Sequence, residues 1–301
     1  MSSQHDDVES LELHGVVPPM LTGFDAAGEV DLDRTAAHAR YVVDGGVHGV
    51  FPLGTNGEFA LLSGSERDAV VAAVVEEIAG EVPVIAGVGT PGTARTVERA
   101  RAAEAAGADG VVAVTPYYYP MDQAALLRHY ERLDESIGLP IYIYQIPSRT
   151  GVTLSHATLA GLAELDGVVG LKDSSKDIGW LVRAQLECPE LTFLIGSDSL
   201  LKPGLDAGCV GLVSAVANVF PDLVVSLYED YQHGRTEPLR RRQEQVLEVR
   251  AALKQGPYLA GIKEALSLSG LELGPLRAPL SRMSEPETET LRETLREQSL
   301  I

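Results

Sequence analysis

Cysteine, lysine and long apolar runs are all scarce in this sequence of 301 residues. The two cysteines, Cys188 and Cys209, are too few for a disulfide framework or for a metal site of their own, so both are expected to be buried thiols. No stretch approaches the roughly 20 consecutive apolar residues of a membrane-spanning helix. The chain begins with polar and acidic residues and lacks the apolar segment of a secretory signal. These absences predict a cytoplasmic protein that does not bind a membrane.

Positive charge is also in short supply. The chain has 24 basic against 43 acidic residues, and its formal net charge is −19. A nucleic-acid partner is not expected, because binding to nucleic acid needs a basic surface. Only five of the basic residues are lysines. An acidic surface with few lysines stays hydrated at high salt, which favours a halophilic source over an ordinary acidic enzyme of the cytosol.

Short apolar runs alternate along the chain with longer amphipathic ones. The strand-like runs cover residues 15–21, 49–53, 82–88, 110–115, 140–146, 168–172, 191–195 and 210–214. Most are apolar throughout, which is typical of parallel strands that are covered on both faces. Helices are expected over residues 32–44, 65–80, 93–106, 122–137, 155–165, 178–187, 202–207, 221–233, 244–253, 259–268 and 286–297.

Eight strand–helix units predict an α/β fold, a (β/α)8 TIM barrel, over residues 15–234. Residues 1–14 would form an N-terminal tail, and residues 235–301 a C-terminal helical extension packed on the barrel. A doubly wound open sheet is the competing architecture. It needs fewer strands, however, and usually has a phosphate-binding loop after the first one.

In such a barrel the chemistry lies at the carboxyl ends of the strands, and Lys172 ends the apolar run 168–172. A charge there is costly unless it has a use. A desolvated lysine has a lowered pKa, so its amine can attack a carbonyl and form a Schiff base. The alternative is a lysine that reaches solvent or pairs with Asp173 or Asp177.

Other strand ends carry further candidates. Tyr144 could move a proton to and from a substrate oxygen, or could be a core aromatic residue. The loop 54–57 contains Thr55 between glycines, which let backbone N–H groups turn inward to hold a carboxylate; a plain tight turn is the alternative. Arg149 could bind a carboxylate or phosphate, or form a surface salt bridge. Tyrosines 117–119 could pack internally or form an interface.

Two patterns are misleading. Residues 87–92 match G-x-G-x-x-G, but the match follows the third strand, contains Pro91 and lacks a ribose-binding acid, so dinucleotide binding is not expected. The seven histidines show no ligand spacing, so a metal-dependent aldolase is not expected either. We therefore expect no metal and no cofactor.

Taken together, the strand ends resemble the dihydrodipicolinate synthase/N-acetylneuraminate lyase family of pyruvate-dependent Schiff-base lyases. The similarity covers nearly the whole chain, roughly residues 15–291. Its motifs are Gly54-Thr55-Asn56-Gly57-Glu58, Thr115-Pro116-Tyr117-Tyr118, Tyr144-Gln145-Ile146-Pro147-Ser148-Arg149-Thr150-Gly151 and Gly170-Leu171-Lys172-Asp173. Four motifs in the right order at the right strands make a specific signal.

The resemblance implies a role for each matching catalytic residue. Lys172 would form the imine with pyruvate or with the 2-oxo group of the substrate, and Tyr144 would be the general acid/base beside it. Thr55 would relay protons between Tyr144 and Tyr118, which would reach in from a neighbouring subunit. The family implies a homotetramer built as a dimer of dimers.

The same resemblance implies the substrate-binding residues. The backbone of Thr55 and Asn56 would hold the pyruvate carboxylate, with the carbonyl of Val213 close by. Arg149 matches an arginine that dihydrodipicolinate synthases use to bind aspartate semialdehyde. Ser197 stands where an acid is often found, and with Asn56 it could hydrogen-bond a hydroxylated substrate.

Several features favour the branches that cleave hydroxylated 2-oxo acids. They are Asn56 in place of the usual second threonine, the run Tyr117-Tyr118-Tyr119-Pro120, and the segments 172–175 and 277–280. The leading hypothesis is an aldolase that splits a 2-keto-3-deoxy sugar acid, with or without a 6-phosphate, into pyruvate and a glyceraldehyde. Dihydrodipicolinate synthase is the second hypothesis and a 2-keto-3-deoxy acid dehydratase the third. A catalytically silent regulator is the alternative from another class.

Overall fold

The structure of the protein is a computed structural model that describes residues 11 and 13–301. The tail predicted over residues 1–14 therefore lies almost entirely outside the described residues. The strands are β1 Gly15–Val16, β2 Ile85–Gly87, β3 Gly110–Val114, β4 Ile141–Gln145, β5 Val168–Asp173, β6 Thr192–Ile195 and β7 Gly211–Leu212. The α-helices are α1 Leu32–Asp44, α2 Gly64–Ile78, α3 Thr93–Ala105, α4 Gln123–Asp134, α5 Pro147–Thr150, α6 His156–Ala163, α7 Ile178–Glu187, α8 Leu201–Asp206, α9 Pro221–Gln232, α10 Thr236–Ala252, α11 Tyr258–Leu268 and α12 Glu285–Glu297.

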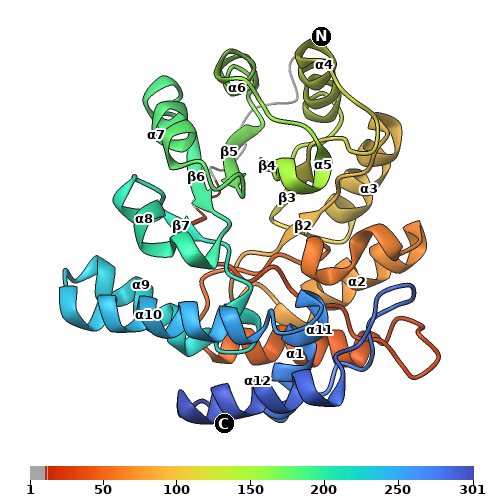
Figure 1. Ribbon diagram of the computed structural model, residues 1–301. Coiled ribbons are helices and arrows are strands. Elements are labelled where there is room, and N and C mark those ends of the chain that lie inside the picture. Colours follow the sequence, from red (N-terminus) through yellow and green to blue (C-terminus); the bar gives the residue numbers. More distant parts are fainter. Residues whose placement is uncertain (1–10, 12) are drawn as a thin grey trace.

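The strands form one parallel sheet in the order β1-β7-β6-β5-β4-β3-β2. Its two edges meet through the segment around residues 50–51, where Phe51 bridges to Pro19 beyond β1 and Val50 bridges to Val84 before β2. The sheet is thereby closed, and helices surround it (Figure 1). The prediction of a (β/α)8 barrel is confirmed.

Several strands are shorter than predicted, and the first two are reduced most. The first, expected over residues 15–21, is paired as a strand only at Gly15 and Val16, because Pro18 and Pro19 follow and have no N–H to donate to a neighbouring strand. The second, over residues 49–53, is reduced to the two closing bridges, and the chain turns at Leu53, whose φ is +61°.

The predicted helices are found, and those over residues 32–44 and 178–187 coincide with α1 and α7. Ser63 caps α2 in a capping box with Glu66. The helix expected over residues 244–253 begins earlier, at Thr236, because α10 packs against α9 although its first turns carry little apolar periodicity. The single-turn helix α5 was not predicted, since one turn is too short to show periodicity.

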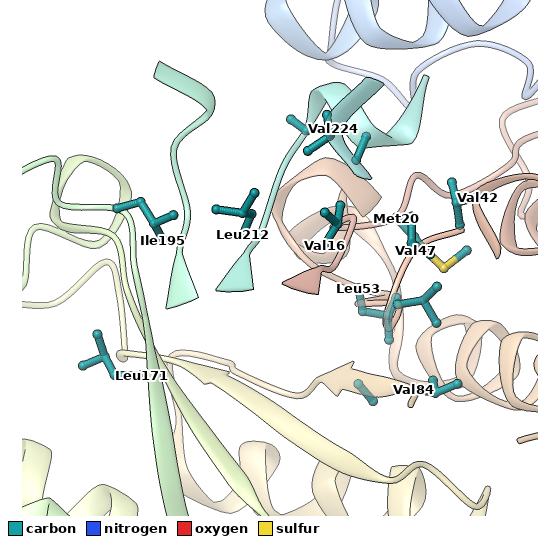
Figure 2. Close-up of a cluster of buried hydrophobic side chains, with 14 of the residues drawn as sticks. Val16, Met20, Val42, Val47, Leu53, Val84, Leu171, Ile195, Leu212 and Val224 are labelled. Carbon is teal, nitrogen blue, oxygen red and sulfur yellow. The ribbon is translucent and has the colours of Figure 1, made fainter. Parts of the chain in front are cut away.

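Alternation along the strands separates two apolar layers. Ala113 and Ile143 face outward into the core between sheet and helices, whereas their neighbours Val112 and Tyr142 face the barrel interior. Figure 2 shows part of the outer layer, where strand residues such as Leu212 and helix residues such as Val224 belong to one buried cluster. Both layers are therefore apolar, which explains strands that read as continuous apolar runs.

The chain continues after the barrel helices into α10, α11 and α12, which lie together on one side of the molecule in Figure 1. Helix α10 contacts the 3-10 turns Asp198–Leu200 and Val216–Asn218, which follow β6 and β7, and α11 contacts the second of them. The extension thus reaches the end of the barrel at which the strands finish.

Both cysteines are free and buried, as predicted. Within the described residues, no helix combines the length and apolar character needed to cross a bilayer.

The backbone of Gly87 in β2 lies close to that of Leu53, and this contact tests how tightly the barrel is closed. A Cβ atom added there would lie 2.2 Å from the carbonyl oxygen of Leu53, which is backbone and cannot easily move. We expect Gly87→Ala to lower the free energy of unfolding by about 2–3 kcal/mol, the upper part of the range for overpacking. Urea denaturation at fixed salt measures this.

The matched control is Gly92→Ala, where an added Cβ would meet no atom within 4 Å. It should cost less than about 1 kcal/mol, the scale of a changed helix N-cap residue. Equal losses in the two variants would show that the contact between residue 53 and β2 is not tight.

Candidate active site

A cavity of about 310 Å³ opens at the carboxyl ends of the strands, where the barrel meets α10 and α11. Seven of the eight predicted site residues line it: Thr55, Asn56, Tyr144, Arg149, Lys172, Ser197 and Val213. These residues come from five different strand ends and lie up to 158 positions apart in the chain (213 − 55). The tertiary structure therefore brings together almost the whole predicted set.

Strand register places the amine beside the phenol. Tyr144 of β4 pairs with Lys172 of β5, and Lys172 pairs in turn with Leu194 of β6. Residues in register on neighbouring parallel strands project from the same face, so all three point into the barrel. The Nζ atom of Lys172 lies 3.8 Å from the centre of the Tyr144 ring and 4.7 Å from that of Phe51.

Lys172 is buried, with 4% of its surface exposed. Burial lowers the pKa of its ammonium group below the ordinary value, and Tyr144 and Asp198 only partly oppose this shift. In the described part of the chain neither neighbouring acid pairs with it: Asp173 accepts hydrogen bonds from Gln145 and Ser175, and Asp177 caps α7. The lysine is therefore buried and forms no ion pair within the described residues, which suits it to act as a neutral amine.

The turn after residue 53 forms one wall of the cavity. It is a 3-10 helix, Thr55–Gly57, in which a Cβ on Gly57 would lie 3.0 Å from the carbonyl oxygen of Met20. The Thr22 hydroxyl donates to the carbonyl of Gly57 at 2.7 Å and fixes the turn. Among the described residues, the buried side-chain amide nitrogen of Asn56 has no hydrogen-bond partner. A buried donor without a partner at a cavity wall fits a ligand that accepts a hydrogen bond.

A buried ion pair supports that turn from behind. Glu58 follows it with φ +55°, and its carboxylate lies 3.1 Å from the Nζ atom of Lys263 on α11. The other carboxylate oxygen accepts from the N–H of Arg277 at 2.9 Å. Both side chains of the pair are almost fully buried. The C-terminal extension thus holds the turn that carries Thr55 and Asn56.

Asp198, which stands next to the predicted Ser197, is a cavity residue that was not predicted. Asp198 is buried and lines the cavity, and its carboxylate accepts a 2.5 Å hydrogen bond from the hydroxyl of Ser214 and a 3.4 Å one from that of Tyr258. Burial raises the pKa of this carboxyl group. The available signal was an acid three residues after the end of an apolar strand. Ser197 also lines the cavity and contacts the hydroxyl of Ser199 at 3.1 Å.

Gln145, the residue after Tyr144, links neighbouring parts of the barrel wall. It is fully buried behind the site, and its side-chain amide donates to Asp173 at 3.1 Å while its oxygen accepts from the N–H of Leu154 at 2.9 Å. It therefore joins β4, β5 and the loop before α6. Arg149 lies on α5, exposed at the cavity mouth.

Tyr118 is the one predicted site residue that does not line the cavity of its own chain. Its side chain is 81% exposed, its φ is +80°, and its ring packs edge-to-face on that of Tyr119, with 4.9 Å between the ring centres. A left-handed backbone is a strained conformation for a bulky residue.

A closed parallel barrel with a buried lysine beside a tyrosine at its catalytic end defines the class of this protein: an enzyme of the (β/α)8 type. Comparison with known proteins names the family. A model of the dihydrodipicolinate synthetase family matches residues 12–298. The chain belongs to this family and is a pyruvate-dependent lyase.

Individual relatives match this chain over nearly their full lengths. An uncharacterized DapA-like lyase of Halobacterium salinarum is 60% identical over 97% of this chain and 96% of its own length. The 4-hydroxy-tetrahydrodipicolinate synthase of Methanopyrus kandleri is 36% identical over 97% of this chain and 98% of its own. The crystal structure of the E. coli K12 prophage protein YagE, of the dihydrodipicolinic acid synthase family and in complex with pyruvate, has a TM-score of 0.92 at 31% identity, covering 96% of this chain and 100% of that one. The Halobacterium relative agrees with the halophilic character expected from the composition.

The ion pair behind the turn leads to a prediction about stability. Lys263→Met leaves Glu58 buried without its partner, so we expect the free energy of unfolding to fall by about 3–5 kcal/mol. Adding Glu58→Gln removes the uncompensated charge, and the double variant should be more stable than Lys263→Met alone. Urea denaturation of both single variants and the double variant measures this.

The control is Lys202→Met, which removes an exposed pair with Asp206 on α8 and should cost less than about 1 kcal/mol. A double variant that is less stable than Lys263→Met would contradict the assignment of the loss to a stranded carboxylate.

Proposed function

We propose that the protein is a Schiff-base aldolase that cleaves a 2-keto-3-deoxy sugar acid to pyruvate and a glyceraldehyde. The observation that carries this proposal is the Lys172–Tyr144 contact, in which a buried amine lies 3.8 Å from the centre of a tyrosine ring at the end of the barrel. An amine that is kept unprotonated can attack the keto carbon, and a phenol at that distance can exchange protons with the substrate.

The steps follow from these positions. The Nζ atom of Lys172 adds to C2 of the substrate, and loss of water gives an iminium ion. Tyr144 takes the proton of the C4 hydroxyl, the C3–C4 bond breaks, and its electron pair moves into the iminium to give an enamine. Protonation of the enamine at C3 and addition of water release pyruvate and the free amine, so the water lost at the start is regained.

Binding of the keto acid uses the turn at residues 55–57. The backbone N–H groups of Thr55 and Asn56 hold the carboxylate, the carbonyl of Val213 lies close to it, and the Thr55 hydroxyl relays protons to Tyr144. The unpartnered amide of Asn56 and the hydroxyl of Ser197 suit a substrate with several hydroxyl groups. Arg149 binds the far end of the substrate. These roles need neither a metal nor a cofactor.

A second candidate function is 4-hydroxy-tetrahydrodipicolinate synthesis, in which the pyruvate enamine condenses with aspartate semialdehyde. Arg149 at the cavity mouth favours it, since a guanidinium group can bind the second carboxylate, and the Methanopyrus relative carries that name. A dehydratase of 2-keto-3-deoxy acids shares the first imine step and is the third candidate.

The proposal includes an oligomer. Tyr118, exposed and held in a left-handed conformation, enters the site of a neighbouring subunit and completes the proton relay through Thr55. A tetramer built as a dimer of dimers provides such a neighbour.

Borohydride trapping tests the imine. With pyruvate and borohydride the protein should gain one reduced pyruvate adduct, on Lys172, whereas Lys172→Ala should gain none and should lose turnover with its fold intact. Because the pKa of Lys172 is lowered, trapping should remain efficient at pH values well below 10.5, where an ordinary lysine is charged. Intact-mass spectrometry, with Lys202→Ala as the control, measures it. A reduced pyruvate adduct in Lys172→Ala would contradict the imine mechanism.

The proton relay gives a separate prediction. Tyr144→Phe keeps the ring that packs on Lys172 but removes the hydroxyl, so turnover should fall by roughly 10²–10⁴-fold.

Assays of the purified enzyme should also show that pyruvate release from 2-keto-3-deoxygluconate is faster than condensation of pyruvate with aspartate semialdehyde. The reverse order, by tenfold or more, would make the protein a synthase.

A further inference from the structure

Four basic side chains gather around the mouth of the active-site cavity. Lys176 lies in the loop after β5, Arg250 on the last turn of α10, Lys254 just beyond that helix, and Arg149 on α5. Three of the five lysines in the chain, Lys172 among them, line this one cavity. Such a concentration is notable in a protein of net charge −19.

The four cations are not held by close ion pairs within the described residues, although the carboxylate of Asp198 attracts Arg250 and Lys254. Among the described residues, none of them forms an ion pair, whereas Arg40, Arg277 and Lys263 each lie against a carboxylate. Arginines elsewhere in the described residues, such as Arg95 and Arg128, also form no ion pair, so these four cations are distinguished by lining a single cavity. Asp198 is the only carboxylate among the described residues of the cavity wall, and its hydrogen bonds go to Ser214, Tyr258 and the backbone.

The cations also affect one another. The pKa of Lys254 is lowered, first by burial and then by the charges of Arg250 and Lys176, while Asp198 opposes the shift. Lys176 has a φ of +68°, a conformation that is costly for a lysine and that persists only where the surrounding structure fixes it. The mutual repulsion of the cations opposes folding, and a bound anion would reduce it.

Depth in the cavity separates these residues from the catalytic lysine. Lys172 is 4% exposed at the bottom of the cavity, whereas Arg149, Lys176 and Lys254 are exposed at its mouth and Arg250 is half-buried. A 2-oxo acid whose keto carbon reaches Lys172 must therefore direct its far end toward the four cations.

We propose that Lys176, Arg250 and Lys254, together with Arg149, bind a phosphate group at the far end of the substrate. This inference rests on the proposed aldolase function and deepens it, since it makes a phosphorylated 2-keto-3-deoxy acid the preferred substrate. A phosphate carries close to two negative charges and offers three acceptor oxygens, so it can engage several cations at once. A single carboxylate, as in aspartate semialdehyde, needs only one bidentate arginine. The C-terminal extension would thus supply two of the residues that select the substrate.

Substrate selectivity tests the proposal. We compare kcat/KM for 2-keto-3-deoxy-6-phosphogluconate and 2-keto-3-deoxygluconate at one fixed ionic strength, because salt screens these charges. The wild-type protein should prefer the phosphorylated acid by roughly 100-fold or more, and Arg250→Gln and Lys254→Gln should each lower that ratio by roughly tenfold. The matched control is Lys202→Gln, a lysine on α8 that pairs with Asp206 outside the cavity and should leave the ratio unchanged.

The outcomes separate the two proposals. A wild-type ratio near one, or a ratio that Arg250→Gln and Lys254→Gln do not change, would overturn the phosphate site while leaving the aldolase intact. If neither sugar acid is cleaved and the variants instead raise the KM for aspartate semialdehyde, the aldolase assignment fails and the cluster is a carboxylate site. Inorganic phosphate gives a readout without turnover: it should bind the wild-type protein in a calorimetric titration and bind Arg250→Gln more weakly, and equal binding to both would count against the site.

Discussion

The burial of one amine against one phenol ring is the constraint on which this site depends. Lys172 and Tyr144 meet because β4 and β5 are parallel neighbours in a fixed register, and a slip of one residue in either strand would turn that strand's side chain outward into the helix layer. The apolar interior that surrounds them, including Phe51 and Leu194, keeps water away from the amine. Fold and chemistry are linked here, since the packing that stabilises the barrel also lowers the pKa of the lysine.

The C-terminal extension takes part in the site on two levels. From behind, Lys263 and the backbone of Arg277 hold Glu58, and so the turn that carries Thr55 and Asn56. At the mouth, α10 and the residue after it contribute Arg250 and Lys254. The barrel alone would provide the amine and the phenol, whereas the extension fixes the turn that carries Thr55 and Asn56 and adds basic side chains to the cavity wall.

Charge is distributed unevenly over this acidic molecule. Most of its basic side chains that are partly buried lie against carboxylates, as Arg277 does against Glu66, which raises the pKa of the guanidinium group and lowers that of the carboxyl group to about 2. The basic residues at the cavity mouth differ in that several of them line one cavity, where Asp198 is the one carboxylate among the described residues of the wall. An acidic exterior with a local positive entrance concentrates anionic substrates at the one place where they react.

Much of this could be predicted from the sequence, because apolar runs that alternate with amphipathic ones determine parallel strands and helices, and a lysine that ends such a run is conspicuous. The barrel, Lys172, Tyr144 and the turn at Thr55 follow from that local information. Sequence alone could not show that Asp198, Arg250 and Lys254 share the cavity, since α10 comes after the barrel strands and no periodicity indicates which strand ends it covers. Nor could it distinguish paired from unpaired cations, because pairing depends on distances between segments that only the packed structure brings together.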